Sequence, residues 1–128
     1  MNKKLFSALI LIILLAFTLA ACTPKDAKSA ESKMKSAGYA VIVQDATEYS
    51  DDPEADGVDK GIMAINPVDS EYLIAIWFTS RTAAKKSFEY YRDSIEVEFE
   101  KKGLTINAVL SGKCIYIGTK QAIRDFKK

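Results

Sequence analysis

The chain has 128 residues, 48% of them hydrophobic, and its 18 basic and 17 acidic residues give a formal net charge of +1. This near balance lacks the basic excess that binding to nucleic-acid phosphates requires, so no nucleic-acid partner is expected. The chain contains no histidine, which excludes catalytic triads built on histidine and zinc hydrolases of the HExxH type. It also has no phosphate loop or dinucleotide-binding fingerprint, so no cofactor is expected.

The first 21 residues have the three parts of an export signal. Lys3 and Lys4 give a positively charged start, positions 5–21 are uncharged and mostly apolar, and small residues precede Cys22. At about 1.5 Å per residue, a helix of this apolar stretch spans roughly 26 Å, which is shorter than the roughly 30 Å that a permanent transmembrane helix crosses. The sequence therefore predicts export followed by cleavage.

The box Leu-Ala-Ala-Cys that ends this segment resembles the lipobox of bacterial lipoproteins. The resemblance implies a cleaved signal peptide over residues 1–21, a lipidated Cys22 and a domain over residues 23–128. The domain would then be held at the extracytoplasmic face of a bacterial cell membrane, because two or three acyl chains form a firm anchor. Since two lysines leave with the signal peptide, the domain itself has a formal net charge of −1.

Caps, turns and glycines divide the domain into elements. Thr23 as N-cap and Pro24 in the first turn predict a helix over 24–37, which Gly38 ends. An open alternative is that residues 23–30 are frayed and form the linker to the lipid. Three strands follow, the last two joined as a β-hairpin by a turn-rich segment. They are expected over 39–44, 61–65 and 72–78.

A long helix is expected from a cap at Thr79 or Ser80 to Lys102, because apolar side chains recur on one face at three- and four-residue steps. These are Ala84, Phe88, Tyr91, Ile95 and Phe99. Gly103 ends that helix. Two strands, over 104–110 and 113–118, and a short helix capped by Thr119 complete the chain. The sequence thus predicts a single α+β domain in the order α-β-β-β-α-β-β-α, with a mainly antiparallel sheet of about five strands packed with three helices.

Cys114 is the second of the two cysteines, and a lipidated Cys22 leaves it without an intrachain disulfide partner. It opens an apolar strand, so a buried thiol is expected. A reactive or intermolecular thiol is the alternative.

The loop over 45–59 is strongly acidic and contains a partial match to a calcium-binding loop. Asp52, Glu54 and Asp56 place carboxylates at alternate positions ahead of a glycine. The position that should carry the bidentate acid is Met63, so the match is incomplete and no firm metal site is predicted. A solvated loop that keeps sheet edges from aggregating is the alternative.

The strand over 72–78 is apolar on both faces. One face carries Tyr72, Ile74, Ile76 and Phe78, and the other carries Leu73, Ala75 and Trp77. Such a strand is either central in a sheet covered on both sides or shows one face to a ligand. Trp77 is accordingly the candidate ligand-binding residue.

A non-catalytic binding or interaction module is the expected function, with the lipid bilayer and a protein of the cell envelope as partners. A small-ligand carrier or sensor, which would use an aromatic sheet face or the acidic loop, is the alternative. An enzyme that relies on carboxylates alone is a third hypothesis. Ser32 and Lys35 match S-x-x-K, but the companion motifs of a serine–lysine hydrolase are missing, so that activity is not expected. An exposed apolar patch would favour the first, a concave aromatic cavity the second, and a pocket with converging acids the third.

Overall fold

The computed structural model describes residues 23–49 and 57–128. They form one α+β domain with a five-stranded antiparallel sheet and three α-helices, and the predicted order of elements is confirmed. A short 3-10 helix, η1, is added after the first strand. The elements are α2 (Ala27–Ser36), β1 (Ala40–Asp45), η1 (Ala46–Tyr49), β2 (Val58–Asn66), β3 (Glu71–Phe78), α3 (Arg81–Lys101), β4 (Asn107–Ser111), β5 (Cys114–Gly118) and α4 (Lys120–Lys127).

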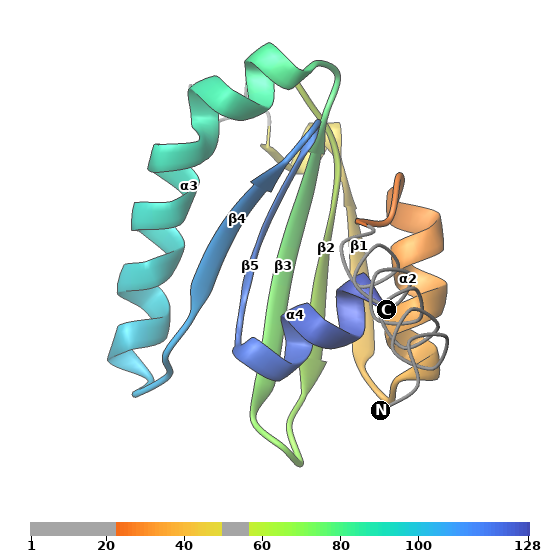
Figure 1. Cartoon of the computed structure of the whole chain (residues 1–128), viewed down its shortest axis with the longest axis vertical. Coiled ribbons are helices and arrows are strands. Elements are labelled where there is room, and N and C mark those ends of the chain that lie inside the picture. The colour runs from red at the N-terminus through yellow and green to blue at the C-terminus, as the bar shows by residue number, and fades with distance from the viewer. Residues whose placement is uncertain (1–22, 50–56) are drawn as a thin grey trace, which may run out of the picture.

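The strands lie in the order β1-β2-β3-β5-β4, and all neighbours are antiparallel (Figure 1). The first three strands follow one another along the chain. The helix α3 then carries the chain past the position of β5 to the far edge, and β5 returns between β3 and β4. As a result β3 is central, and β1 and β4 form the two edges of the described sheet.

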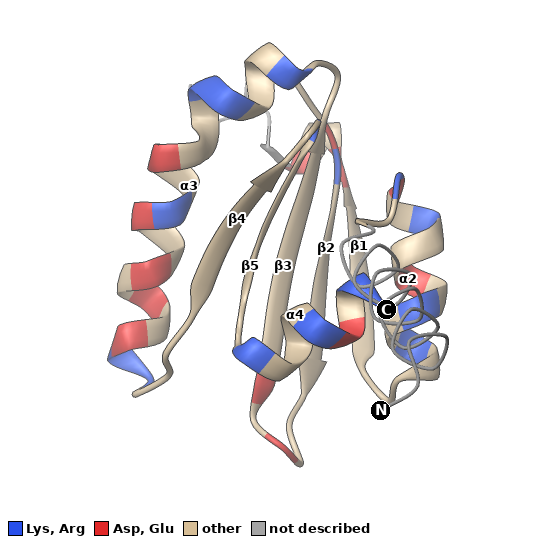
Figure 2. Cartoon of the chain, in the orientation of Figure 1, with Lys and Arg blue, Asp and Glu red and all other residues tan. Residues whose placement is uncertain are grey.

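Charged side chains are nearly absent from the strands and concentrated on the helices (Figure 2). The exceptions lie at strand ends: Asp45, Asp59, Lys60 and Glu71. This distribution fits a sheet with helices on both faces, because a charged side chain in the middle of a covered strand would lose its hydration.

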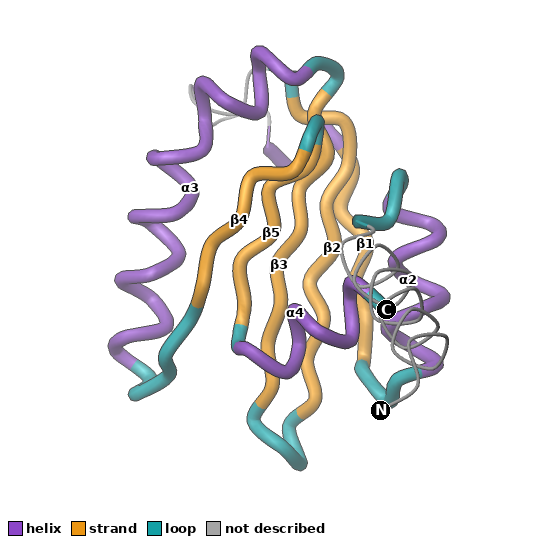
Figure 3. The backbone as a smooth tube through the Cα atoms, in the orientation of Figure 1, coloured by secondary structure: helices purple, strands orange, loops and turns teal. Residues whose placement is uncertain are grey.

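Two buried clusters occupy the two faces of the sheet. The first, under α2 and α4, contains Leu73, Ala75 and Trp77 of β3. The second, under α3, contains Ile76 and Phe78 of the same strand. Because successive side chains of a strand point to opposite faces, the alternation predicted for this strand is confirmed. Figure 3 shows the strands running side by side with the helices outside them.

The first helix starts three residues later than predicted, and Thr23 is not its cap. Asp26 is the N-cap, and its carboxylate accepts a hydrogen bond from the backbone N–H of Ser29 at 2.8 Å. Pro24 stays outside the helix because its carbonyl oxygen accepts a hydrogen bond from the Trp77 indole N–H at 3.0 Å. The Thr23 hydroxyl donates instead to the Ser111 hydroxyl at 3.0 Å.

Two strands begin three residues away from their predicted starts, and the other three begin within one residue of theirs. The strand β2 begins at Val58 rather than 61, because Val58 is buried and pairs with Phe78 beyond an irregularity in the register. The strand β4 begins at Asn107 rather than 104, since its partner β5 ends at Gly118, which pairs with Asn107. The residues before Asn107 have no further partner in β5 and remain outside the strand.

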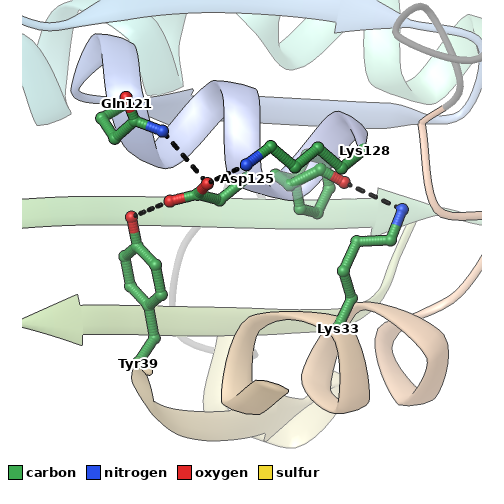
Figure 4. Close-up of polar contacts among 6 residues, drawn as sticks. Lys33, Tyr39, Gln121, Asp125 and Lys128 are labelled. Carbon is green, nitrogen blue, oxygen red and sulfur yellow. Dashed lines mark hydrogen bonds and ion pairs between the residues drawn. The ribbon is translucent and has the colours of Figure 1, made fainter. Parts of the chain in front are cut away.

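Polar contacts join α4 to α2 and to the segment between α2 and β1 (Figure 4). The Tyr39 hydroxyl donates to the Asp125 carboxylate at 2.8 Å, and the Lys33 ammonium donates to the carbonyl oxygen of Phe126 at 3.3 Å. Thr119 occupies the N-cap position of α4, but its side chain makes no cap hydrogen bond. Its hydroxyl instead donates to the Glu71 carboxylate at the start of β3.

Within residues 23–49 and 57–128, none of the helices combines the length and apolarity needed to cross a bilayer.

Candidate functional site

A half-open apolar groove lies between α3 and the sheet, on the face opposite α2 and α4. We call it the α3 groove. Its volume is about 490 Å³. It exists because α3 packs against β3, β5 and β4 and leaves the β1 and β2 half of this face without a covering helix among the described residues.

Side chains at alternate positions of two neighbouring strands form the floor of the groove. Met63 and Ile65 come from β2, and Tyr72, Ile74 and Ile76 come from β3. Within each strand these residues are two apart, so they share one face. The antiparallel register places Met63 opposite Ile74 and Ile65 opposite Tyr72.

The floor continues toward the edge of the sheet at β1. Ile42 of β1 pairs with Met63, and 58% of its surface is exposed. Exposure of this size is unusual for an isoleucine in a strand, where both neighbours and one face are normally packed. The groove and the β1 edge thus form one apolar surface.

The wall of the groove is one side of α3. Tyr91, Ile95 and Phe99 recur at four-residue steps, so they lie above one another on the helix. The Phe99 ring lies 5.8 Å from the Tyr72 ring, measured between centroids, which joins wall to floor at one end. Tyr90 forms the outer lip of the wall and is 41% exposed.

Polar groups are confined to the rim. Gln44, Ser94, Glu98 and Lys102 contribute them. The Lys102 ammonium lies 5.8 Å from the centre of the Tyr72 ring, within range of a cation–π contact. Glu98 is the one carboxylate among the lining residues in the described ranges, and Lys101 donates to it at 3.4 Å. The arrangement suits an elongated apolar ligand and offers no second acid for acid–base catalysis.

Trp77, the residue singled out from the sequence, lies on the other face of the same strand. It is 4% exposed, and its ring lies 6.1 Å from the Phe126 ring. With its indole N–H bonded to Pro24, it is part of the core under α2 and α4. Its edge contributes to a second, charged depression of about 560 Å³ beside the start of α2.

The α3 groove was missed because its floor and wall look like ordinary core in the sequence. The sequence pattern predicts one apolar face of a strand, made of Tyr72, Ile74 and Ile76. It also predicts one apolar face of a helix, made of Tyr91, Ile95 and Phe99. The available signal was the two-faced apolarity of β3. This pattern shows that helices cover both faces of β3 or that one face is open to a ligand, but it does not distinguish these two arrangements.

Cys114 is a free, buried thiol at the start of β5. It is 2% exposed, and burial raises its pKa to about 12. A thiol with so high a pKa is almost entirely protonated at neutral pH and is a poor nucleophile. Cys22, the expected lipidation site, lies outside the described residues.

The calcium candidates Asp52, Glu54 and Asp56 also lie outside the described residues. At the start of the same acidic loop, the Asp45 side chain accepts hydrogen bonds from the Thr47 hydroxyl and backbone N–H, which lower the pKa of its carboxyl. Over the described ranges, no group of three or more Cys, Asp and Glu side chains is placed to hold a metal ion.

Comparisons with known protein families, with curated proteins and with solved structures found no match for this chain.

Proposed function

We propose that this chain is a membrane-tethered, non-catalytic binding module that holds an elongated apolar ligand in the α3 groove. The module acts at the extracytoplasmic face of a bacterial cell membrane. The tether and the location rest on the lipobox resemblance at Cys22, and the ligand class rests on the groove.

The observation that supports the ligand class is the shape and lining of the groove. Small-molecule sites are typically concavities of about 300–1,000 Å³ with apolar and aromatic walls and a few polar groups. The α3 groove, at about 490 Å³, falls in this range and has three tyrosines and a phenylalanine in its lining. Of the three hypotheses drawn from the sequence, a concave aromatic cavity favours the small-ligand carrier.

The absence of a catalytic role is supported by the chemistry of the side chains. The chain has no histidine, and its thiol at Cys114 is buried with a raised pKa. Glu98 supplies a carboxylate to the groove rim without a second acid in the described part of the lining. Glycoside chemistry needs two carboxylates that flank the reacting bond, so one acid at the rim does not suffice.

A second candidate function is the docking of a protein partner at the β1 edge. Ile42 and Val43 are 58% and 39% exposed and point to opposite faces of β1. An edge strand with exposed apolar side chains can accept an additional strand from a partner, which supplies main-chain hydrogen bonds. Such a partner would extend the floor of the groove rather than fill it.

Site-specific photocrosslinking in cells separates these two functions. The crosslinking amino acid p-benzoylphenylalanine replaces Tyr90, at the lip of the groove, in the full-length tagged protein. A matched position is Val97, which lies on the same helix, is 50% exposed and does not line the groove. We expect irradiation to add a discrete small mass to the Tyr90 variant, seen by intact-protein mass spectrometry, and none to the Val97 variant.

Four further variants complete the test: Ser94→Phe, Val97→Phe, the crosslinking amino acid at position 42, and Cys22→Ala. Adding Ser94→Phe, which fills the groove from α3, should abolish the small-mass adduct, whereas Val97→Phe should leave it. Equal adducts at positions 90 and 97 would contradict a groove ligand. A protein-sized adduct from position 42, with no small mass at position 90, would favour the β1 partner. In the same cells, Cys22→Ala should move the protein from the membrane to the soluble fraction, and retention in the membrane would contradict the tether.

A further inference from the structure

We propose that the outer surface of α2 and α4 docks on anionic lipid headgroups and holds the tethered domain with its α3 groove facing away from the membrane. We call this surface, residues 25–36 and 120–128, the basic layer. The inference rests on the proposed lipid tether at Cys22 and adds an orientation to it.

The two sides of the sheet differ in charge, because α2 and α4 are strongly basic whereas the acidic residues of α3 are concentrated in its second half. The basic layer has eight basic side chains against three acidic ones, a formal net charge of +5. On the other side, residues 89–100 of α3 have five acidic side chains against one basic one, a net charge of −4. Figure 2 shows the contrast, with blue on α2 and α4 and red bands along the lower half of α3. An anionic surface would attract the first side and repel the acidic second half of α3.

The basic residues are concentrated on the outward side of each helix. Lys120, Arg124 and Lys127 of α4 recur at three- and four-residue steps, opposite the buried Ala122 and Phe126. In α2, Lys28 and Lys35 are seven residues apart and share an exposed side of the helix, beside the buried Ala30 and Met34. Their charges therefore point away from the core as one surface.

Helix stability does not account for several of these charges. Cations stabilise the C-terminus of a helix and destabilise its N-terminus, because of the helix dipole. Yet Lys120 is the first residue of α4, and Lys28 is in the first turn of α2. Apart from the N-cap of α2, Asp26, neither helix has an acidic residue at its start. Over the described ranges, four basic residues of these helices form no ion pair within 4.0 Å: Lys28, Lys120, Arg124 and Lys127. These charges remain available to an external anionic surface.

The start of the described chain lies on the same side. Thr23, the residue next to the proposed lipid attachment, is held to Ser111 by a hydrogen bond. Beside it lies the charged depression at the start of α2, which is lined by four lysines and two carboxylates: Lys25, Lys28, Lys60, Lys113, Asp26 and Asp59. With almost no linker between the lipid and α2, the tether would hold this side close to the headgroups, where each cation contributes to binding.

The orientation is tested with the lipidated full-length chain reconstituted into vesicles. One vesicle type is phosphatidylcholine alone, and the other contains phosphatidylglycerol at about a third of the lipid. Ser32→Cys, on the outward side of α2, and Val97→Cys, on α3, each carry a polarity-sensitive fluorophore. Cys114 is buried and Cys22 would be acylated, so labelling is confined to the introduced cysteine.

We expect the Ser32 probe to shift to shorter wavelength and to be quenched by spin-labelled lipid only on phosphatidylglycerol vesicles at low salt. The Val97 probe should stay exposed on both. Lys28→Gln with Arg124→Gln should lower the docked-to-undocked ratio by about fivefold for each charge removed. The matched pair Lys85→Gln and Lys86→Gln, on α3, should leave the ratio unchanged.

The outcomes separate the docking from the tether. A chain that does not float with either vesicle type would overturn the tether. A chain that floats with both but leaves the Ser32 probe exposed would overturn the docking alone. Protection of the Val97 probe, or protection of the Ser32 probe that high salt does not reverse, would also overturn the docking, because screening by salt weakens contacts between exposed charges.

Discussion

The two faces of the sheet have similar side chains but different coverings. On one face α2 and α4 seal Leu73, Ala75 and Trp77 to 4% exposure or less. On the other, α3 alone covers Ile76 fully but leaves Ile74, two residues earlier, only half-buried at the floor of the groove. The chemistry of β3 is apolar on both sides, so the helices decide whether a side becomes core or binding surface.

The width of the sheet explains this difference. Five strands spaced by about 4.8 Å extend over roughly 19 Å, whereas one helix with its side chains is about 10–12 Å wide. Two helices therefore cover a face of this sheet and one helix covers about half of it. The remaining half, over β1 and β2, contains the exposed Ile42 and adjoins the α3 groove, whose floor is formed by β2 and β3.

The largest expected effect comes from opening the sealed face with Phe126→Ala. Phe126 is fully buried, and its ring lies 4.9 Å from the Tyr116 ring. Removing it should lower the free energy of unfolding by about 3–5 kcal/mol, because a cavity remains that the packed neighbours cannot fill. The measurement is urea unfolding of the full-length protein in detergent, followed by circular dichroism.

The matched change on the other face is Tyr90→Ala. Tyr90 lies at the lip of the groove and is 41% exposed. Its loss should lower the free energy of unfolding by about 1 kcal/mol or less, as for most partly exposed positions. Equal losses for the two variants would contradict the distinction between a sealed and an open face.

An effect smaller than that of Phe126→Ala is expected from Trp77→Phe. Phenylalanine cannot donate a hydrogen bond to Pro24, so the carbonyl oxygen of that residue is left without its buried donor. We expect a loss of about 1–3 kcal/mol in the free energy of unfolding. Since Trp77 is the single tryptophan of the chain, the unmodified protein should show a blue emission that acrylamide does not quench. A red, readily quenched emission would place Trp77 at the surface.

A loss of about 1 kcal/mol in the free energy of unfolding is expected from Tyr39→Phe, and it should depend on pH. Burial alone would raise the pKa of Asp125, but hydrogen bonds from Tyr39, Lys128 and Gln121 outweigh it and lower the pKa. A lowered pKa stabilises the fold above the unfolded-state value of about 3.9, and this stabilisation is lost as the pH falls below it.

The measurement is the difference in unfolding free energy between the unmodified protein and Tyr39→Phe across the acid range. The difference should be constant from pH 7 down to about pH 5 and then shrink as Asp125 becomes protonated. Tyr90→Phe, which removes a hydroxyl from the open side, serves as the control and should show no such acid dependence. A difference that grows below pH 4 would contradict the role of Asp125.

The sequence predicted most of the fold because its signals are local. Ser80 caps α3 through a hydrogen bond from the backbone N–H of Ala83 at 3.1 Å, as one of the two expected caps. Gly38 and Gly103 follow the helices α2 and α3 with positive φ, as expected for residues beyond a helix end. The predicted helix start was wrong where a residue distant in sequence forms the hydrogen bond that would otherwise belong to the helix. Thr23 and Pro24 were expected to begin a helix, but their polar groups bond to Ser111 and Trp77 instead.

The candidate site was predictable only in part. By itself, the sequence determined the class of fold, the order of its elements and the apolarity of both faces of β3, because caps, glycines and two-residue alternation act over a few residues. Only the tertiary structure decided that Trp77 lies in the core and that Tyr72, Ile74 and Ile76 line a groove. Whether a face of β3 becomes core or a groove depends on how many helices pack on it. That packing is formed by contacts between residues far apart in sequence.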